Sequence, residues 1–539
     1  LLGSSGSAQW QPAGDKIKTP WAEKVDPACP LNEYPRPLAE RARWKNLNGL
    51  WNYSIVPAGT PAGAYDGQIL VPFAVESSLS GIGKRLGAEN ELWYARTFVV
   101  PTDWNGDRIL LHFGAVDWKA DVWVNDVQVG SHTGGYAPFT FDVTAALHKK
   151  GENTLKVRVW DPTERGEQPR GKQTSAPGGI WYTPVSGIWQ TVWLEPVPQR
   201  YIAVLRTTPD IDRRTRVTLK SGKETVDEVK SYAAMRKFST ARDADGIVRL
   251  QLNNRDLFMF GPLDQGWWPD GLYTAPTDEA LEYDVIKTKQ WGFNMIRKHV
   301  KVEPARWYTH CDRHGIIVWQ DMPSSTGGPQ WQMEQYFDGA EWQRSPESEA
   351  DFRKEWQEIM DYLYSNPCIG VWVPFNEAWG QFETAEIAQW TKTHDPTRLV
   401  NPASGGNHYP CGDMLDLHHY PDPEMYLYDA KRATVLGEYG GIGMAAEGHL
   451  WEPDRNWGYV QFKTPAEVTE AYLRYTGMLL DMIPRGFSAG VYTQTSDVEI
   501  EVNGLMTYDR KKIKIDETKV REINQAICRS LEHKDKTAR

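Results

Sequence analysis

Cysteine is scarce in this chain and does not cluster. Only five cysteines occur in 539 residues, and no Cys-x-x-Cys pair is present. They stand far apart, as Cys29, Cys311, Cys368, Cys411 and Cys528. This spacing indicates neither a zinc site nor a disulfide framework. We therefore expect no metal and no cofactor, and no motif supports the alternative of a structural calcium, magnesium or sodium ion.

Long apolar runs and a surplus of basic residues are also missing. No stretch approaches the ~18 uninterrupted apolar residues that indicate a transmembrane helix, so we expect no membrane span. The 60 basic residues are outnumbered by 71 acidic ones, which gives a net charge of −11. That balance argues against nucleic acid as a partner.

The first nine residues carry a weak signal about location. They are apolar and then small up to Ala8, which is typical either of the end of a cleaved export signal or of an expression-tag remnant. We expect a periplasmic or secreted protein, with a cytoplasmic location as the alternative. The sequence leaves a homo-oligomer open.

Aromatic residues, by contrast, are abundant. The chain has 25 tryptophans and 24 tyrosines. Most such rings pack in cores, but their flat apolar faces also stack on the C–H faces of sugars. A chain of this length is too long for one core. We therefore expect several domains and consider a carbohydrate as the ligand.

The first 198 residues have the pattern of antiparallel β-structure, because short apolar or alternating runs are separated by turn residues. The runs are 50–56, 92–100, 108–113, 120–129, 139–143 and 153–160. Asn125-Asp126 has the composition of a hairpin turn. We predict a β-sandwich over 1–198. Residues 199–252 contain strand-like runs at 201–208, 214–220 and 246–252, too few for a complete second sandwich.

From residue 253 to 539 strands and helices alternate. Eight apolar runs occur at 257–260, 293–296, 316–319, 369–375, 399–401, 415–417, 434–436 and 489–493. Helical periodicity is clear at 351–365, where apolar residues recur at spacings of four, three and four, and Thr277 is suited to cap an earlier helix. Eight β/α units over this length predict a (β/α)8 barrel.

Polar residues follow nearly every run, at the ends of the strands where barrels build their active sites. Glu377 follows the fourth run and Glu438 the seventh, so these carboxylates can face each other across the barrel mouth. Glycoside hydrolysis needs two such acids, one to protonate the leaving oxygen and one to attack C1 or activate water. The pair predicts a glycosidase.

Several motifs resemble glycoside hydrolase family 2, which contains β-galactosidases, β-glucuronidases and β-mannosidases. Val373–Gly380 is similar to its acid/base signature, and Leu436–Gly440 to its nucleophile strand. Further similar segments, in matching order, are Leu47–Trp51, Trp93–Arg96, Gly187–Trp193, Gly292–Arg297, Trp307–Gly315 and Val318–Asp321. The resemblance implies a sugar-binding jelly roll, an immunoglobulin-like domain and a barrel, in that order. Residues 199–252 hold only part of the middle domain.

The resemblance also implies the roles of individual residues. Glu377 would be the acid/base and Glu438 the nucleophile of a retaining mechanism, with Asn376 on the sugar 2-hydroxyl, Arg297 orienting the nucleophile and Tyr420 close to it. Tyr492 would replace the family's tryptophan under the sugar. The full set of expected substrate-binding residues is Asp264, Arg297, Asn376, Trp379, His418, Tyr420 and Tyr492.

We expect an exo-acting hydrolase of terminal β-galactosides, with Trp181 and Tyr182 of a long jelly-roll loop narrowing the mouth. No Asn-x-Lys motif is placed as in glucuronidases, which argues against glucuronides. The alternatives are the same mechanism on a β-glucuronide, β-glucoside or α-L-arabinopyranoside, or a carbohydrate-binding protein without catalysis. His418 and His419 were also considered as metal ligands with Asp416, but adjacent residues on a strand point to opposite sides.

Overall fold

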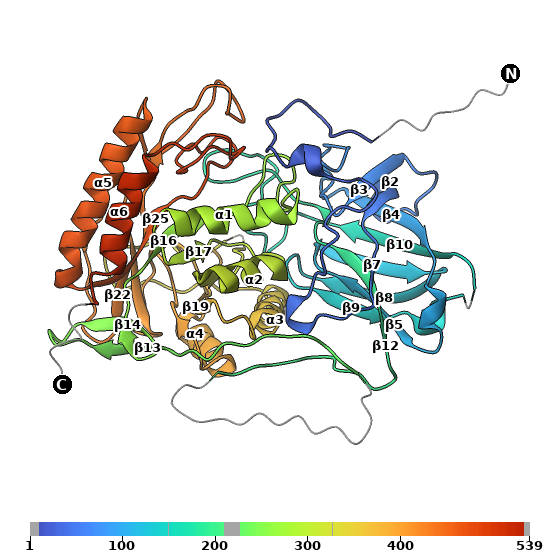
Figure 1. Cartoon of the computed structure of the whole chain (residues 1–539), viewed down its shortest axis with the longest axis horizontal. Helices are drawn as coiled ribbons and strands as arrows, with labels where there is room; N and C mark the ends of the chain where they lie inside the picture. Colours follow the sequence, from blue (N-terminus) through green and yellow to red (C-terminus); the bar gives the residue numbers. More distant parts are fainter. Residues whose placement is uncertain (1–9, 149, 210–226, 326, 533–539) are drawn as a thin grey trace.

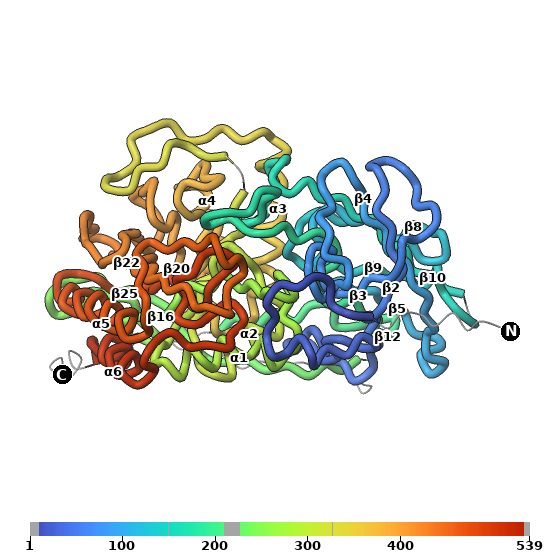
Figure 2. Tube along the Cα trace, turned by 90° about the horizontal axis from the view of Figure 1, so that it is seen from above, coloured from blue at the N-terminus to red at the C-terminus, as the bar shows by residue number. Residues whose placement is uncertain are grey.

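A computed structural model describes residues 10–148, 150–209, 227–325 and 327–532. A β-domain and a barrel lie side by side (Figures 1 and 2). The signal at residues 1–9 and the strand expected at 214–220 lie outside the described residues. None of the described helices is long and apolar enough to cross a bilayer.

The N-terminal domain is a sandwich of two antiparallel sheets, as predicted. One sheet has the order β3-β2-β4-β10-β7-β8 and the other β1-β12-β5-β9. The strands are β1 (Lys45–Asn46), β2 (Gly49–Pro57), β3 (Gly67–Val71), β4 (Asn90–Phe98), β5 (Arg108–Phe113), β7 (Lys119–Val124), β8 (Val127–Thr133), β9 (Phe139–Asp142), β10 (Asn153–Trp160) and β12 (Val192–Val197). Two short strands, β6 (Val116–Asp117) and β11 (Gly187–Ile188), pair separately. Asn125 and Asp126 both have positive φ, the conformation of a two-residue hairpin turn.

The segment between sandwich and barrel forms one small sheet within the described residues. It contains β13 (Phe238–Arg242), β14 (Val248–Leu252) and β15 (Arg255–Asp256). The strand expected at 246–252 is confirmed, whereas 201–208 forms no strand. An incomplete immunoglobulin-like domain therefore stays a prediction.

All eight expected barrel strands are present. They are β16 (Met259–Asp264), β17 (Met295–Lys298), β18 (Ile317–Asp321), β19 (Ile369–Val373), β20 (Leu399–Val400), β21 (Met414–His418), β22 (Ala433–Gly440) and β25 (Phe487–Thr493). Their order is β20-β19-β18-β17-β16-β25-β22-β21, with parallel pairing throughout. Parallel bridges from Ser404 to Asn376 and to Asp416 connect the two open edges. Because all eight barrel strands run in the same direction, their C-terminal ends, which carry the polar residues, meet at one mouth of the barrel.

Helices surround the barrel incompletely. They are α1 (Asp278–Gln290), α2 (Ala305–His314), α3 (Pro346–Leu363), α4 (Thr384–His394), α5 (Pro465–Met482) and α6 (Glu517–Cys528). Residues 401–432, all described, contain no helix between β20, β21 and β22. The helix expected at 351–365 begins earlier, because Ser345 caps it and Pro346 occupies its first turn.

Thr277 caps α1 as predicted, since its hydroxyl accepts the Ala280 amide at 3.1 Å. We expect Thr277→Ala to lower the free energy of unfolding by about 1 kcal/mol, the usual cost of a lost cap. Thr393→Ala, at an exposed position inside α4, is the control and should cause no loss because alanine is the better helix former. Urea unfolding measures both, and equal stability of both variants would contradict the capping role.

The two domains share a hydrophobic cluster. Tyr136, Tyr182 and Trp189 of the sandwich pack with Trp267 and Tyr273 of the barrel. Ring centroids of Tyr182 and Trp267 lie 5.2 Å apart. This contact fixes the long sandwich loop that contains Tyr182 against the barrel mouth.

Candidate active site

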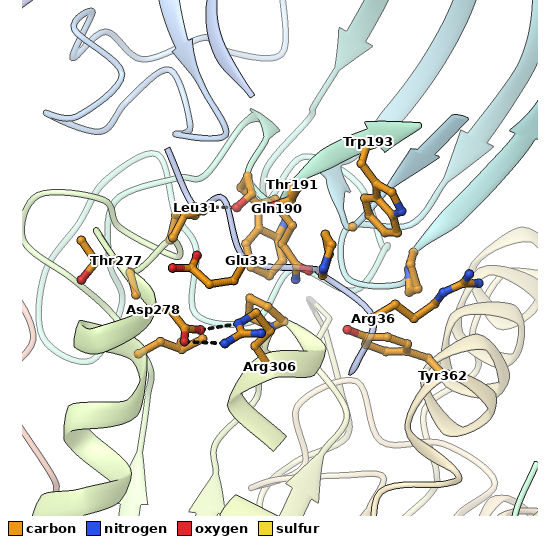
Figure 3. Close-up of a pocket in the computed structure, with 18 residues that line it drawn as sticks. Leu31, Glu33, Arg36, Gln190, Thr191, Trp193, Thr277, Asp278, Arg306 and Tyr362 are labelled. Atoms are coloured by element: carbon orange, nitrogen blue, oxygen red, sulfur yellow. Dashed lines mark hydrogen bonds and ion pairs between the residues drawn. The ribbon is translucent and has the colours of Figure 1, made fainter. Parts of the chain in front are cut away.

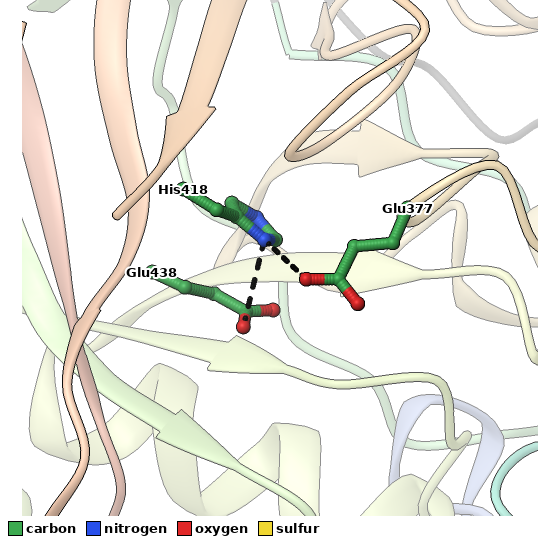
Figure 4. Close-up of side chains that lie close together, drawn as sticks. All are labelled: Glu377, His418 and Glu438. Atoms are coloured by element: carbon green, nitrogen blue, oxygen red, sulfur yellow. Dashed lines mark hydrogen bonds and ion pairs between the residues drawn. The ribbon is translucent and has the colours of Figure 1, made fainter. Parts of the chain in front are cut away.

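Glu377 and Glu438 meet at the barrel mouth, together with His418 (Figure 4). One ligand atom of each residue lies within 4.8 Å of those of the other two. Glu377 follows β19 in a turn where both it and Ala378 have positive φ, an uncommon conformation for residues other than glycine. The amide of Glu377 donates to the Ser404 carbonyl at 2.9 Å. The turn is thereby held with the carboxyl group aimed into the barrel.

His418 lies between the two carboxylates. Its Nδ1 is 2.9 Å from Glu377 Oε1 and 3.5 Å from Glu438 Oε2, and its Nε2 is 2.8 Å from the Ser404 hydroxyl. Burial lowers the pKa of His418, but the charges of Glu438 and Glu377 outweigh burial and raise it above its ordinary value. The imidazole therefore links the two acids.

Glu438 is held as a carboxylate by its neighbours. Arg297 Nη1 donates to Oε1 at 3.2 Å, and the Tyr420 hydroxyl donates to Oε2 at 2.7 Å. Burial raises the pKa of Glu438, but neighbouring charges, His418 first, lower it well below its usual range. Arg297 is itself fixed by Asp321 at 2.9 Å. An ionised carboxylate aimed at the mouth suits a nucleophile.

Asn376 and Trp379 also lie where the sequence predicts. Asn376 Oδ1 accepts from Arg297 Nη2 at 2.7 Å, which leaves the buried Nδ2 group without a partner among the described residues. An unpaired buried amide is costly, so Nδ2 is available to a ligand hydroxyl. Trp379 lines the pocket, with its ring 5.0 Å from that of Trp181.

Two expected residues are placed elsewhere. The carboxylate of Asp264 accepts from Lys298 at 2.8 Å in a buried cluster with Glu303, and its neighbour Gln265 lines the pocket instead. Tyr492 packs outside the barrel strands, with its ring 4.7 Å from that of Tyr472 on α5. Its position under a sugar is therefore a wrong expectation, and Thr493 faces the pocket in its place.

A small pocket lies above the carboxylates. Glu377, Glu438, Trp379 and Tyr420 line this pocket, as expected from the sequence. The other lining residues were not expected and are Lys172, Ile180, Leu263, Gln265, His299, Tyr459, Thr493 and Glu501. Burial lowers the pKa of His299 well below its ordinary value, as do the charges of Lys172 and Arg297, so its ring is neutral. Polar groups therefore surround the space from both domains.

The long sandwich loop does reach the mouth. The Tyr182 hydroxyl hydrogen-bonds to Glu501 and accepts from Gln265 at 2.6 Å. Lys172 and Ile180 of the same loop line the pocket. The loop closes one side of the site, which the aromatic pair at 181–182 had suggested.

The spacing of Glu377, His418 and Glu438 would also suit a metal ion. Both carboxylates already contact cationic or donor groups, and both ring nitrogens of His418 have partners. His419 points away, with Nε2 2.9 Å from Glu424. That the protein needs no metal stays a prediction.

His418→Gln is expected to move the acidic limb of the pH profile of kcat/KM upward by about 1 pH unit. The charge of His418 lowers the pKa of Glu438, which keeps this carboxylate ionised as the pH falls. Without that charge the pKa rises, and Glu438 is protonated at a higher pH. His419→Gln is the matched control and should leave the profile unchanged. An unmoved limb in His418→Gln would rule out the electrostatic role.

A second, larger pocket lies at the junction of the two domains (Figure 3). Apolar side chains such as Leu31 and Trp189 line it. Its charged groups include Arg306 and Asp278, which bind each other at 2.5 Å. No pair of free carboxylates, which glycoside hydrolysis needs, occurs among its described lining residues.

Comparisons with known proteins identify the family of the chain. Residues 83–185 match the family described as glycosyl hydrolase 2 galactose-binding domain-like, and residues 250–527 match the glycosyl hydrolases family 2 TIM barrel domain. A β-glucuronidase of Bacteroides fragilis is 21% identical over 520 residues, which are 78% of this chain and 73% of that protein. A β-glucuronidase of Paenibacillus borealis is 34% identical over 122 residues, 21% of this chain and 20% of its own length. A β-galactosidase of Klebsiella pneumoniae is 23% identical over 60% of this chain and 37% of its length.

Solved structures share the fold at low identity. A β-glucuronidase from Ruminococcus gnavus in complex with D-glucuronic acid has a TM-score of 0.68 at 16% identity, covering 92% of this chain and 100% of that one. A β-galacturonidase from Eisenbergiella tayi bound to galacturonate has a TM-score of 0.66 at 17% identity, covering 92% and 99%. The barrel match spans more than half of the chain. The chain belongs to glycoside hydrolase family 2.

Proposed function

We propose that the protein is a retaining exo-β-glycosidase that removes terminal sugars from the non-reducing ends of its substrates. The observation that carries this proposal is the pair of carboxylates at the mouth, with ligand atoms of Glu377, His418 and Glu438 all within 4.8 Å of one another. Carboxyl groups ~5–5.5 Å apart are typical of retention, whereas inversion needs ~6.5–9.5 Å to admit a water molecule. The short separation favours a covalent intermediate.

The reaction takes two steps. Glu438 attacks C1 of the sugar while the glycosidic C1–O bond breaks, and the leaving oxygen takes the proton of Glu377. Glu377 then removes a proton from water as its oxygen attacks C1, and the bond to Glu438 breaks. The released sugar keeps its anomeric configuration. Arg297 and Tyr420 hold the Glu438 oxygens in place for both steps.

The pocket walls support action at chain ends. Lys172 and Ile180 of the sandwich loop and Trp379 of the barrel line the pocket, and Trp181 packs on Trp379 outside it. These side chains come from both domains and enclose the space above the carboxylates on one side. A wall on one side favours binding of a terminal sugar over binding in the middle of a chain.

The relatives bear names of two sugar classes, β-glucuronidases and β-galactosidases. The β-galactosides expected from the sequence and the β-glucuronides are therefore both candidate substrates. Both leave the same anomeric chemistry to Glu377 and Glu438. The choice between them depends on the walls of the pocket.

The proposed mechanism is tested by the stereochemistry of the product and by trapping. Proton NMR should show the β-anomer of the released sugar first, before it mutarotates. A 2-deoxy-2-fluoro β-glycoside with a good leaving group should inactivate the protein, and mass spectrometry of the digest should place the sugar on Glu438. An α-anomer as the first product, or a label on another residue, would overturn the proposal.

A further inference from the structure

Lys172 is a largely buried basic residue at the active site that has no hydrogen-bond or ion-pair partner among the described residues. Its side chain comes from the sandwich loop, lines the pocket and is only 5% exposed. Its Nζ lies 5.8 Å from the ring centroids of both Tyr182 and Trp379. The ammonium group forms no hydrogen bond or ion pair with any described residue. A largely buried charge in this state is unfavourable.

The backbone holds this ammonium group in position. Gly171 has φ +63°, and a Cβ there would lie 2.7 Å from the Val300 carbonyl oxygen and 2.6 Å from the Tyr273 hydroxyl. The amides of Arg170 and Gly171 both donate to the Ser324 carbonyl, at 2.7 and 3.0 Å. The loop is thus pressed against the barrel directly before Lys172. The backbone contacts therefore fix the position of Lys172 at the edge of the pocket.

The acidic groups around Lys172 are occupied by other partners. Glu501 binds the Tyr182 hydroxyl and accepts the Asn503 amide at 3.0 Å. Glu438 is bound by Arg297 and Tyr420. Among the described lining residues, Lys172 is the one lysine or arginine, and it lines the space above the catalytic carboxylates.

This arrangement suits a charged sugar better than a neutral one. Neutral polar side chains are sufficient to hydrogen-bond sugar hydroxyls, and Gln265, Thr493 and Tyr459 of the pocket are such side chains. An ammonium group in such a largely enclosed place is stabilised more by an anion than by a neutral hydroxyl, because a charge-assisted hydrogen bond is stronger than a neutral one. An anionic sugar also needs a cation here, because Glu377 and Glu438 repel it.

We propose that Lys172 binds the carboxylate of a terminal β-uronide, so that a residue of the sandwich loop selects an acidic sugar for the barrel. The proposal rests on the glycosidase function proposed above and specifies its substrate class. It also accounts for the binding of a uronide by a chain that lacks the Asn-x-Lys motif of glucuronidases.

Two matched pairs of p-nitrophenyl substrates test this selection, because the members of each pair differ only at C6. They are the β-D-glucuronide with the β-D-glucoside, and the β-D-galacturonide with the β-D-galactoside. The wild type should prefer the uronide in at least one pair. In Lys172→Met the ratio of kcat/KM for that uronide to its neutral partner should fall about 100-fold, as expected for loss of a hydrogen bond between charged groups.

Control variants separate specificity from folding. Arg165→Met removes an exposed cation from the same loop, with its side chain 68% exposed, and should keep the ratio. Lys172→Arg should restore part of the uronide preference. The melting temperature of Lys172→Met should equal or exceed that of the wild type, because an unpaired buried charge is removed. A lower melting temperature with an unchanged ratio would make Lys172 a structural counter-ion of Glu501 and overturn the proposal.

The outcomes distinguish the two proposals. Turnover of only the neutral substrates, or equal losses on both members of a pair in Lys172→Met, overturns the role of Lys172 and leaves the glycosidase intact. No turnover of any of the four contradicts the glycosidase function itself. Thermal shift gives a readout without catalysis: D-glucuronate or D-galacturonate should raise the melting temperature more than D-glucose or D-galactose, and only when Lys172 is present.

Discussion

Glu438→Gln is expected to lower kcat/KM by about 10⁴-fold or more, the scale seen when a nucleophile is removed from an active site. The amide has the shape of the carboxylate but neither its charge nor its ability to form a stable bond to C1. Arg297 keeps Asp321 as a partner at 2.9 Å, so the surrounding site has little reason to rearrange. The measurement is kcat/KM on the best aryl β-glycoside, with circular dichroism to confirm the fold.

Glu447→Gln is the matched control for this substitution. Glu447 is exposed and lies nine positions beyond Glu438 in the chain, so the same chemical change there should leave kcat/KM within about twofold of wild type, as for surface substitutions generally. Azide adds a second readout on Glu438→Ala, since it can enter the space of the lost carboxylate. The product should then be the α-glycosyl azide. Activity of Glu438→Gln within tenfold of wild type would remove Glu438 from the role of nucleophile.

The barrel and its catalytic pair could be predicted because their signals are local. Each apolar run corresponds to a buried strand. Glu377 follows β19, and Glu438 lies near the end of β22. Strand ends of a parallel barrel meet at one face whatever the loops do. Once the strands were counted, the two acids had to share the mouth.

The direction of individual side chains could not be predicted in the same way. Strands β16 and β25 are buried on both faces over their whole length, so they lack the alternation that shows which face is which. Asp264 and Tyr492 were therefore assigned to the pocket, whereas the residues that follow them, Gln265 and Thr493, line it. An error of one residue turns a side chain to the other face.

The part of the pocket wall that comes from the sandwich domain could not be predicted, for a different reason. Lys172 lies in a loop rich in glycine and proline, without a periodic pattern and far from the barrel in the sequence. Contacts made in the folded protein bring that loop to the mouth, such as the packing of Tyr182 on Trp267 and the hydrogen bonds of Arg170 and Gly171. The aromatic pair at 181–182 indicated that the loop could reach the site, but nothing in it pointed to the lysine.

Glu377→Ala is expected to lower kcat/KM by about 10²–10⁴-fold on substrates with poor leaving groups, the usual contribution of general acid–base catalysis. The loss should shrink as the leaving group improves, because a dinitrophenolate departs without a proton whereas a sugar or phenol needs one. His418 cannot supply that proton equally well, since it sits beside Glu377, 2.9 Å from Oε1, and not at the position of the carboxyl group itself. The measurement is a plot of log kcat/KM against leaving-group pKa, which should be steeper than for wild type.

Azide distinguishes this acid from the nucleophile. In Glu377→Ala it can attack the sugar still bound to Glu438 from the face that Glu377 occupied, which gives the β-glycosyl azide, the opposite anomer to that expected from Glu438→Ala. Because the two carboxylates face each other across the pocket with ligand atoms within 4.8 Å, each alanine opens one face only. The same anomer from both variants would show that the two roles are wrongly assigned, whereas opposite anomers would fix each glutamate to its side of the sugar.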